Sequence, residues 1–217
     1  MANPLLGAIK EGNAAEVRRL IDTEPELLNS PDVNGASPLL TAIYYQKHDI
    51  AKTIADAVPL IDIFEAAALG RVERIKELLR EDASLAGAYS PDGFPAVGLA
   101  AFFGHAEAVK TLIAAGADVH AAAKNPLKVQ AIHAAVASKN LDIVRAVLDA
   151  GADPNAAQQQ GFRPIHEAGS SGSRELAELL MKYGADPSAK NDEGKTASTL
   201  ARDKGHADLA GWLENRR

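Results

Sequence analysis

Several residue types and patterns are missing from this 217-residue sequence, and each absence narrows the class of protein. Cysteine is absent, which excludes disulfides and thiolate metal sites and is compatible with a cytoplasmic protein. No run of about 18 apolar residues occurs, so no membrane-spanning helix is predicted. The start of the chain, Met1-Ala2-Asn3-Pro4, lacks the charged and apolar segments of a secretory signal. We therefore expect a cytoplasmic protein with no membrane partner.

Positive charge is also scarce. The sequence has 23 Lys and Arg against 29 Asp and Glu, which gives a formal net charge of -6. Such a surface repels the phosphate backbone of nucleic acids, and the terminal pair Arg216-Arg217 is too small a basic cluster to offset this. We expect no nucleic-acid partner.

The sequence does contain a repeat. Gly116, Gly151 and Gly184 each follow an amphipathic run and begin a Gly-Ala-Asp turn, with spacings of 35 (151 − 116) and 33 (184 − 151) residues. Glycine at such a position can adopt the left-handed conformation that closes a helix. A short helix is predicted before each run, as at Pro164-Ile165-His166-Glu167-Ala168, because proline suits the first helical position. The pattern therefore predicts that each unit consists of a turn, a short helix, a tight turn, a second helix and a cap.

The tight turns give the number of units and one irregularity. The predicted tight-turn residues are Gly12, Gln46, Gly70, Gly104, Lys139, Gly172 and Gly205. They are 33 to 35 residues apart, except for a step of 24 (70 − 46). The connection in that short step, Val58-Pro59-Leu60, leaves no room for a protruding hairpin finger. One finger is therefore predicted to be absent between the second and third units. The predicted units, which form one domain over residues 1–217, are residues 1–31, 32–59, 60–89, 90–122, 123–156, 157–189 and 190–217.

The period and two signature stretches resemble the ankyrin repeat, a β-turn followed by two helices. The stretches are Ser37-Pro38-Leu39-Leu40-Thr41-Ala42 and Arg163-Pro164-Ile165-His166-Glu167-Ala168. The resemblance covers essentially the whole chain and implies an all-α solenoid of about seven helix-turn-helix units with short β-turn fingers. The layout, with residues 62–70, also looks like that of small stand-alone bacterial ankyrin-repeat proteins. A tetratricopeptide array has a similar period but lacks the Gly-Ala-Asp cap.

No set of residues for catalysis, cofactor binding or metal binding is found, and the repeats leave no room for a separate catalytic domain. His133 and His166 occupy the signature position, where we expect structural hydrogen bonds to a neighbouring loop. His166-Glu167 lacks the second histidine of the zinc-protease pattern. The stretch 169–173 does not match a phosphate-binding loop and is predicted to be a tight turn between helices. We therefore expect a protein that is not an enzyme and has no cofactor and no metal.

The resemblance implies a partner-binding surface, because ankyrin-like arrays usually bind proteins on the concave face. By position, residues just before each tight turn face that groove, and the residue before each short helix lies near the fingers. The predicted partner-binding residues are Tyr44, Tyr45, Leu69, Phe94, Phe102, Phe103 and Phe162. Aromatic residues are enriched at interface hot spots. The alternative for each residue is packing beneath the next unit.

These observations predict a monomeric module for protein–protein interaction that binds an unidentified protein as a scaffold or inhibitor. Two alternatives stay open. One is a ligand-binding or enzyme-like protein on a repeat scaffold, which a buried polar pocket with a co-purified molecule would favour. The other is a structural, self-associating spacer, which self-association without a captured partner would favour.

Overall fold

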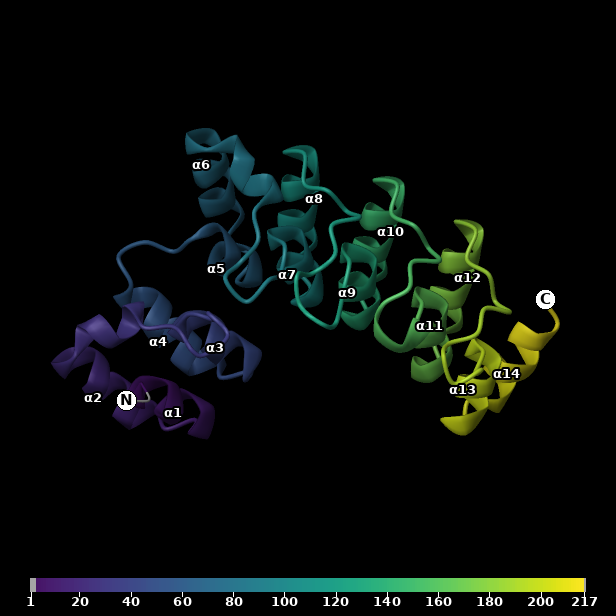
Figure 1. The fold of residues 1–217 in the computed structure, drawn as a ribbon, viewed down its shortest axis with the longest axis horizontal. Helices are drawn as coiled ribbons and strands as arrows, with labels where there is room; N and C mark the ends of the chain where they lie inside the picture. Colours follow the sequence, from purple (N-terminus) through teal and green to yellow (C-terminus); the bar gives the residue numbers. More distant parts are fainter. Residues whose placement is uncertain (1–2, 217) are drawn as a thin grey trace.

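The computed structural model describes residues 3–216, and in these residues fourteen α-helices form seven consecutive pairs (Figure 1). The first helices of the pairs are α1 Pro4–Glu11, α3 Pro38–Tyr44, α5 Ile63–Ala68, α7 Ala96–Phe102, α9 Ala131–Ala137, α11 Pro164–Ser171 and α13 Ala197–Asp203. The second helices are α2 Ala14–Thr23, α4 His48–Ala57, α6 Val72–Glu81, α8 Ala106–Ala114, α10 Leu141–Asp149, α12 Arg174–Lys182 and α14 Ala207–Glu214. The first residues of the predicted first unit, 1–2, and the last residue of the chain, 217, lie outside the described residues.

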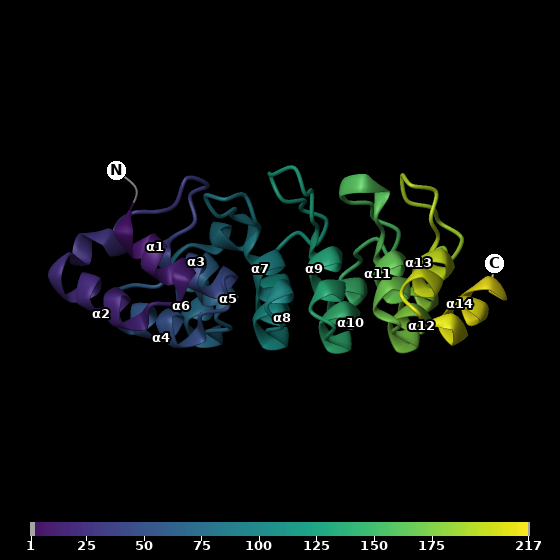
Figure 2. The same cartoon turned by 90° about the horizontal axis from the view of Figure 1, so that it is seen from below.

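The pairs stack side by side along the long axis of the molecule, and most of the loops that join them project to one side (Figure 2). Between residues 3 and 216 there is no β-strand, and the only isolated bridge, Tyr89 with Pro95, closes the base of one loop. Short 3₁₀ helices, η1 Pro25–Asn29, η2 Ala83–Gly87 and η3 Gln159–Gly161, lie in three of the connections. The predicted all-α solenoid with the architecture of ankyrin repeats is confirmed.

Each pair is closed by a tight turn with left-handed backbone at the predicted residue. All seven predicted positions have positive φ, including the two that are not glycine, Gln46 at 55° and Lys139 at 58°. The predicted cap glycines Gly116, Gly151 and Gly184 have φ of 92°, 93° and 94°. Both sets of predictions are confirmed, because the positions that need left-handed backbone were visible in the sequence.

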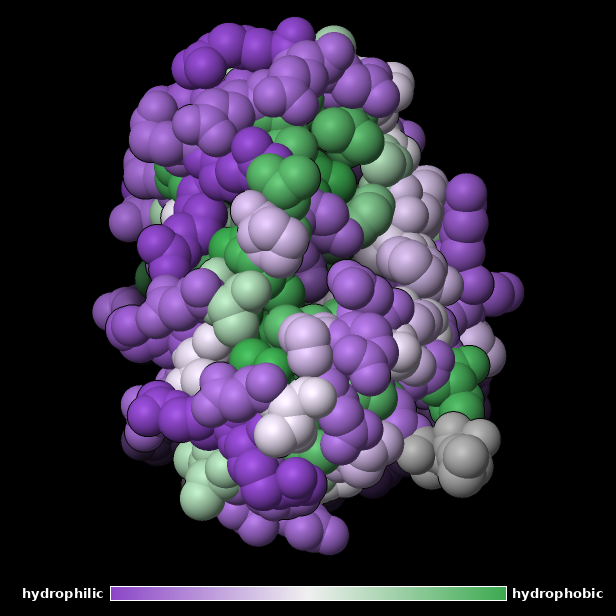
Figure 3. All heavy atoms as spheres, turned by 90° about the vertical axis from the view of Figure 1, so that its left-hand side faces the viewer, coloured by the Kyte–Doolittle hydropathy of each residue, from purple (hydrophilic) through white to green (hydrophobic). Residues whose placement is uncertain are grey.

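The core runs through the stack along the short first helices. Their small residues let neighbouring helices approach closely, as at Ala66, Ala100 and Ala135, which have no exposed surface. At Gly169 in α11 the neighbouring helix comes so close that an added Cβ would lie 2.2 Å from the carbonyl oxygen of Ala197 in α13. The N-terminal end of the stack presents mainly hydrophilic residues, with a broken band of hydrophobic residues across the middle (Figure 3).

The second and third pairs are joined without a finger, as predicted. The helix α4 ends at Ala57 and α5 begins at Ile63. The loops on either side of the missing finger meet each other: an added Cβ at Gly35 would lie 2.7 Å from the Cβ of Pro91. On the other side of the stack the helices α4 and α6 stand apart. Figure 1 shows the first two pairs turned away from the remaining five at this joint.

Candidate binding groove

One groove of about 620 Å³ lies along the first helices of the fourth to sixth pairs, α7, α9 and α11, and beneath the loops that precede α9 and α11. We call it the α7–α11 groove. Its lining is mainly apolar and includes Tyr44, Phe94, Pro95, Leu99, Phe102, Leu127, Val129, Val136, Phe162 and Pro164. Two of these side chains, Phe102 and Leu127, are about half exposed, at 54% and 46%. The groove thus offers apolar surface that the fold itself leaves uncovered.

Four of the seven predicted partner-binding residues line this groove: Tyr44, Phe94, Phe102 and Phe162. The other three lie outside it. Tyr45 is 49% exposed, with the Lys10 Nζ 5.6 Å from the centre of its ring. Phe103 and Leu69 are half-buried against the core. Within the pair Phe102–Phe103 the first residue therefore faces the groove and the second supports it.

An aromatic cluster forms the N-terminal edge of the groove. The rings of Tyr44 and Phe103 are stacked with centroids 6.0 Å apart, and Phe102 meets Phe103 edge-on at 5.1 Å. The Tyr44 hydroxyl donates a 2.7 Å hydrogen bond to Asp92, which also accepts one from Ser90. Burial, with the neighbouring carboxylate, raises the pKa of Tyr44 far above its ordinary value. Tyr44 therefore stays a hydrogen-bond donor and fixes this edge.

Three consecutive glutamines, Gln158, Gln159 and Gln160, form the polar rim on the loop before α11. Their backbone is held in place: the Gln159 N–H donates to the Leu127 carbonyl at 3.3 Å, and the Gln160 carbonyl accepts from the Asp192 N–H at 3.0 Å. Within residues 3–216 their side-chain amides make no hydrogen bond. These amides therefore keep both donors and acceptors for another molecule.

Two charged residues of α11 and its cap also line the groove. Glu167 is half-buried, and loss of solvent raises the pKa of its carboxyl group, with Lys139 acting in the opposite direction. Arg163 donates through Nη1 to the carbonyl of Asn155, and its buried Nε has no partner. The Glu167 carboxylate is thus the charged group in the groove that keeps unused hydrogen-bond acceptors.

The two signature histidines serve the scaffold. In each, Nδ1 accepts the backbone N–H three residues earlier, at 3.1 Å for His133 and 2.9 Å for His166. Each Nε2 lies 3.0 Å from a carbonyl of the following loop, that of Ala156 or Ala189, which fixes the neutral form with the proton on Nε2. Burial lowers the pKa of both imidazoles. The predicted hydrogen bonds to a neighbouring loop are confirmed.

Sequence reasoning missed Leu127, Glu167 and the three glutamines as groove residues. Leu127 carried a signal, because a large apolar residue stands there in the turn Asn125-Pro126-Leu127-Lys128. Glu167 and the glutamines carried none, since polar residues at a loop and on a short helix are ordinary. Their role in the groove depends on which loops the stack brings together.

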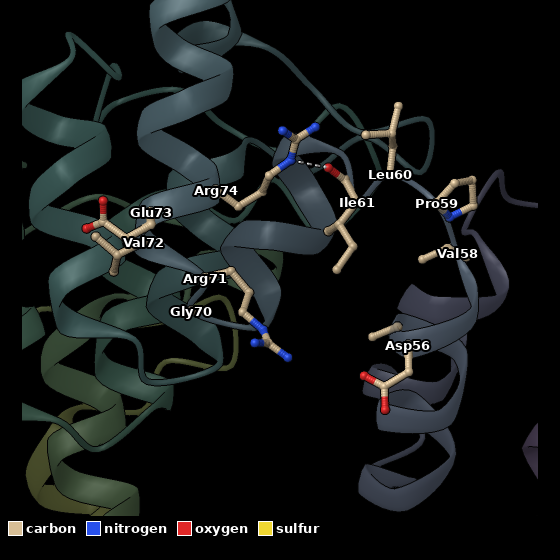
Figure 4. Close-up of a pocket in the computed structure, with 11 residues that line it drawn as sticks. Asp56, Val58, Pro59, Leu60, Ile61, Gly70, Arg71, Val72, Glu73 and Arg74 are labelled. Carbon is tan, nitrogen blue, oxygen red and sulfur yellow. Dashed lines mark hydrogen bonds between the residues drawn. The ribbon is translucent and has the colours of Figure 1, made fainter.

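A second opening, of about 740 Å³, lies between α4 and α6 at the fingerless joint. Figure 4 shows Arg71 and Asp56 pointing toward one another across it, while the Arg74 Nε donates a 3.1 Å hydrogen bond to the Ile61 carbonyl. Leu60 in the connection is 73% exposed. None of the seven predicted residues lines this opening.

The repeated part of the chain matches a known protein family. A family model described as ankyrin repeats (three copies) matches residues 63–158, 100–191 and 132–215, which together cover most of the chain. No curated protein matches the sequence. None of the helices within residues 3–216 has the length and apolar character needed to cross a membrane.

Proposed function

This chain belongs to the ankyrin-repeat family, and from that premise we propose that it binds a partner protein in the α7–α11 groove. Ankyrin repeats are generally modules for protein–protein interaction, and the family is typically non-enzymatic. In this proposal the protein holds its partner by equilibrium binding, as a scaffold or inhibitor, and catalyses no reaction. The proposal includes a monomeric state, which light scattering would test, and a cytoplasmic location.

The exposed apolar side chains of the groove carry this proposal. Five large hydrophobic residues are exposed among residues 3–216, and two of them, Phe102 and Leu127, line this one groove. Covering such side chains contributes about 25 cal/mol for each Å² of apolar surface removed from water. A contiguous exposed apolar patch on a folded protein favours an interaction site.

The rigidity of the α7–α11 groove also supports the proposal that it binds a partner protein. The groove edge is fixed by the ring contacts of Tyr44, Phe102 and Phe103, and its rim by backbone hydrogen bonds between loops. A surface that is already ordered loses little conformational entropy when a partner docks, which favours affinity.

The seven predicted residues take different parts in the proposal. Tyr44, Phe94, Phe102 and Phe162 contact the partner directly. Phe103 and Leu69 support the surface from beneath, and the half-exposed Tyr45 extends it beyond the groove. Leu127 joins the contacting set.

Affinity capture with mass spectrometry from native extract tests the proposal. Phe102→Ser and Leu127→Ser should each lose the proteins that the unchanged chain captures, with circular dichroism and melting temperature preserved. Val33→Ser is the matched control, because Val33 is fully exposed on the first loop and lies outside the groove. Equal capture by all four proteins would contradict the proposal.

A further inference from the structure

We propose that the α7–α11 groove selects an extended partner segment that places a lysine or arginine against Glu167 and a large apolar side chain beside Phe102 and Leu127. This inference rests on the proposed function and names the chemistry of the partner.

The preference for a lysine or arginine in the partner rests on the environment of the Glu167 carboxylate. Its carboxylate makes no hydrogen bond or ion pair within residues 3–216, although it is half-buried in a mainly apolar groove. Many other acidic side chains have partners, such as Glu107 with Lys110 and Glu178 with Arg174. A carboxylate that has lost part of its hydration without gaining a partner is stabilised by a cation brought to it.

Neither Lys139 nor Arg163 pairs with the Glu167 carboxylate. Lys139, in the turn between α9 and α10, acts on Glu167 through space but is exposed to water and forms no ion pair with it. Arg163 precedes Glu167 by about one helical turn, but its guanidinium donates to the Asn155 carbonyl and its Nε is buried. The groove therefore carries an unpaired negative charge that a partner can reach.

The apolar part follows from the size and lining of the groove. Its volume of about 620 Å³ lies within the range of about 300 to 1,000 Å³ in which proteins bury drug-sized ligands. Phe102 and Leu127 expose their side chains there, and Val129 and Phe162 belong to the same lining. One large apolar side chain of a partner would cover these surfaces, and a single buried anchor of this kind often dominates an interface.

The extended conformation follows from the glutamine rim. The side-chain amides of Gln158, Gln159 and Gln160 have no partner in the described part of the chain, whereas the backbone of Gln159 and Gln160 is bonded to the neighbouring loops. A primary amide can donate to a carbonyl and accept from an N–H at once, which matches the exposed backbone of an extended segment. Backbone pairing fixes the segment, and the two side chains give the selectivity.

An array of synthetic decapeptides tests this directly. Each peptide has a Gly/Ser background, one Phe at a fixed position, and Lys, norleucine or Glu at each of the remaining positions in turn. At the best register, the unchanged protein should retain the Lys peptide about fivefold more than the Glu peptide, the size expected of a partly exposed ion pair. The norleucine peptide should lie between them.

Charge reversal identifies the residue responsible. Glu167→Lys should reverse the preference, so that the Glu peptide is retained more than the Lys peptide. Glu175→Lys is the control, because Glu175 is exposed on α12 outside the groove, and it should keep the original preference. Phe102→Ser should reduce retention of every peptide.

Two outcomes would overturn the inference: no peptide retained, or the same preference in Glu167→Lys as in the unchanged protein. Neither touches the proposed function, which falls only if Phe102→Ser and Leu127→Ser leave capture from extract intact.

Discussion

The junction between the second and third pairs differs from the junction between the fifth and sixth. At the regular junction the cap turn after α10 bonds to the next cap turn: the Asn155 amide donates to the Gly184 carbonyl, and its oxygen accepts from the Asp186 N–H, both at 2.8 Å. Ala152 and Ala156 are buried there. At the fingerless junction nothing replaces this segment, and an opening of about 740 Å³ lies between α4 and α6.

The comparison shows what a finger and its cap do. At the regular junction they act as a spacer that fills the space between neighbouring pairs. Without the spacer, the stack closes on the side of the loops, where Gly35 meets Pro91 and Tyr44 bonds to Asp92, and opens on the other side. The same omission therefore produces both the edge of the binding groove and the opening opposite.

The largest expected effect comes from filling the space at a regular junction. Gly169→Ala should lower the free energy of unfolding by about 3 kcal/mol, because the added methyl would meet the Ala197 backbone and helices α11 and α13 must move apart. Urea denaturation measures it. Gly7→Ala in α1 is the control: apart from the adjacent residues and the backbone of its own helix, no atom lies within 4 Å of its added Cβ, so we expect up to about 1 kcal/mol of stabilisation. Equal effects at both sites would mean that the regular junctions are not tightly packed.

A smaller effect is expected at the fingerless junction. Tyr44→Phe removes the hydrogen bond to Asp92 but keeps the ring stacking on Phe103, and should weaken closure by about 1.5 kcal/mol. Because the chain has no cysteine, spin labels can be placed at Asp56→Cys and Arg71→Cys, which lie on opposite sides of the opening. Their distance distribution should broaden in Tyr44→Phe.

The regular junction between α8 and α10 supplies the control for this measurement. Labels at Ala115→Cys and Ala150→Cys, just after these helices, should give a narrow distribution that Tyr44→Phe leaves unchanged. Broadening at both pairs of labels, or at neither, would show that the joint is no more mobile than the rest of the stack.

The smallest effect is in the pH dependence, and its sign separates the two kinds of junction. Burial lowers the pKa of His133 and His166. The contribution of these two histidines to stability is therefore fully present above their unfolded-state pKa of about 6.5 and is lost as the pH falls below that value. Burial raises the pKa of Glu65, which accepts a 2.7 Å hydrogen bond from Ser37 across the fingerless joint. Its contribution is present at low pH and is lost as the pH rises through that raised value.

Urea denaturation between pH 4 and pH 8 tests both signs. The double variant His133→Gln/His166→Gln should lose less of its free energy of unfolding as the pH falls than the unchanged protein does. His120→Gln, at an exposed position, is its control. Glu65→Gln should flatten the opposite trend while keeping a polar partner for Ser37. If the pH dependence of the free energy of unfolding is unchanged in one of these variants, the group replaced in that variant does not contribute to it.

The sequence by itself determined the repeat, the local backbone and one omission. Positive φ was predictable even at Gln46 and Lys139, because the repeat period assigns them to the same turn as the glycines. The absent finger was equally visible, since Val58-Pro59-Leu60 is too short to form one. These features depend on spacing along a single unit.

The tertiary structure decided how side chains from different units meet. The pairing of Tyr44 with Asp92, 48 residues away, and the convergence of Leu127, Gln159 and Glu167 on one groove were not predictable. The physical reason is that periodicity sets which face of a helix is buried, whereas distances between units depend on the angle at which they stack. At the fingerless joint that angle results from closure on one side and opening on the other, which no repeat pattern encodes.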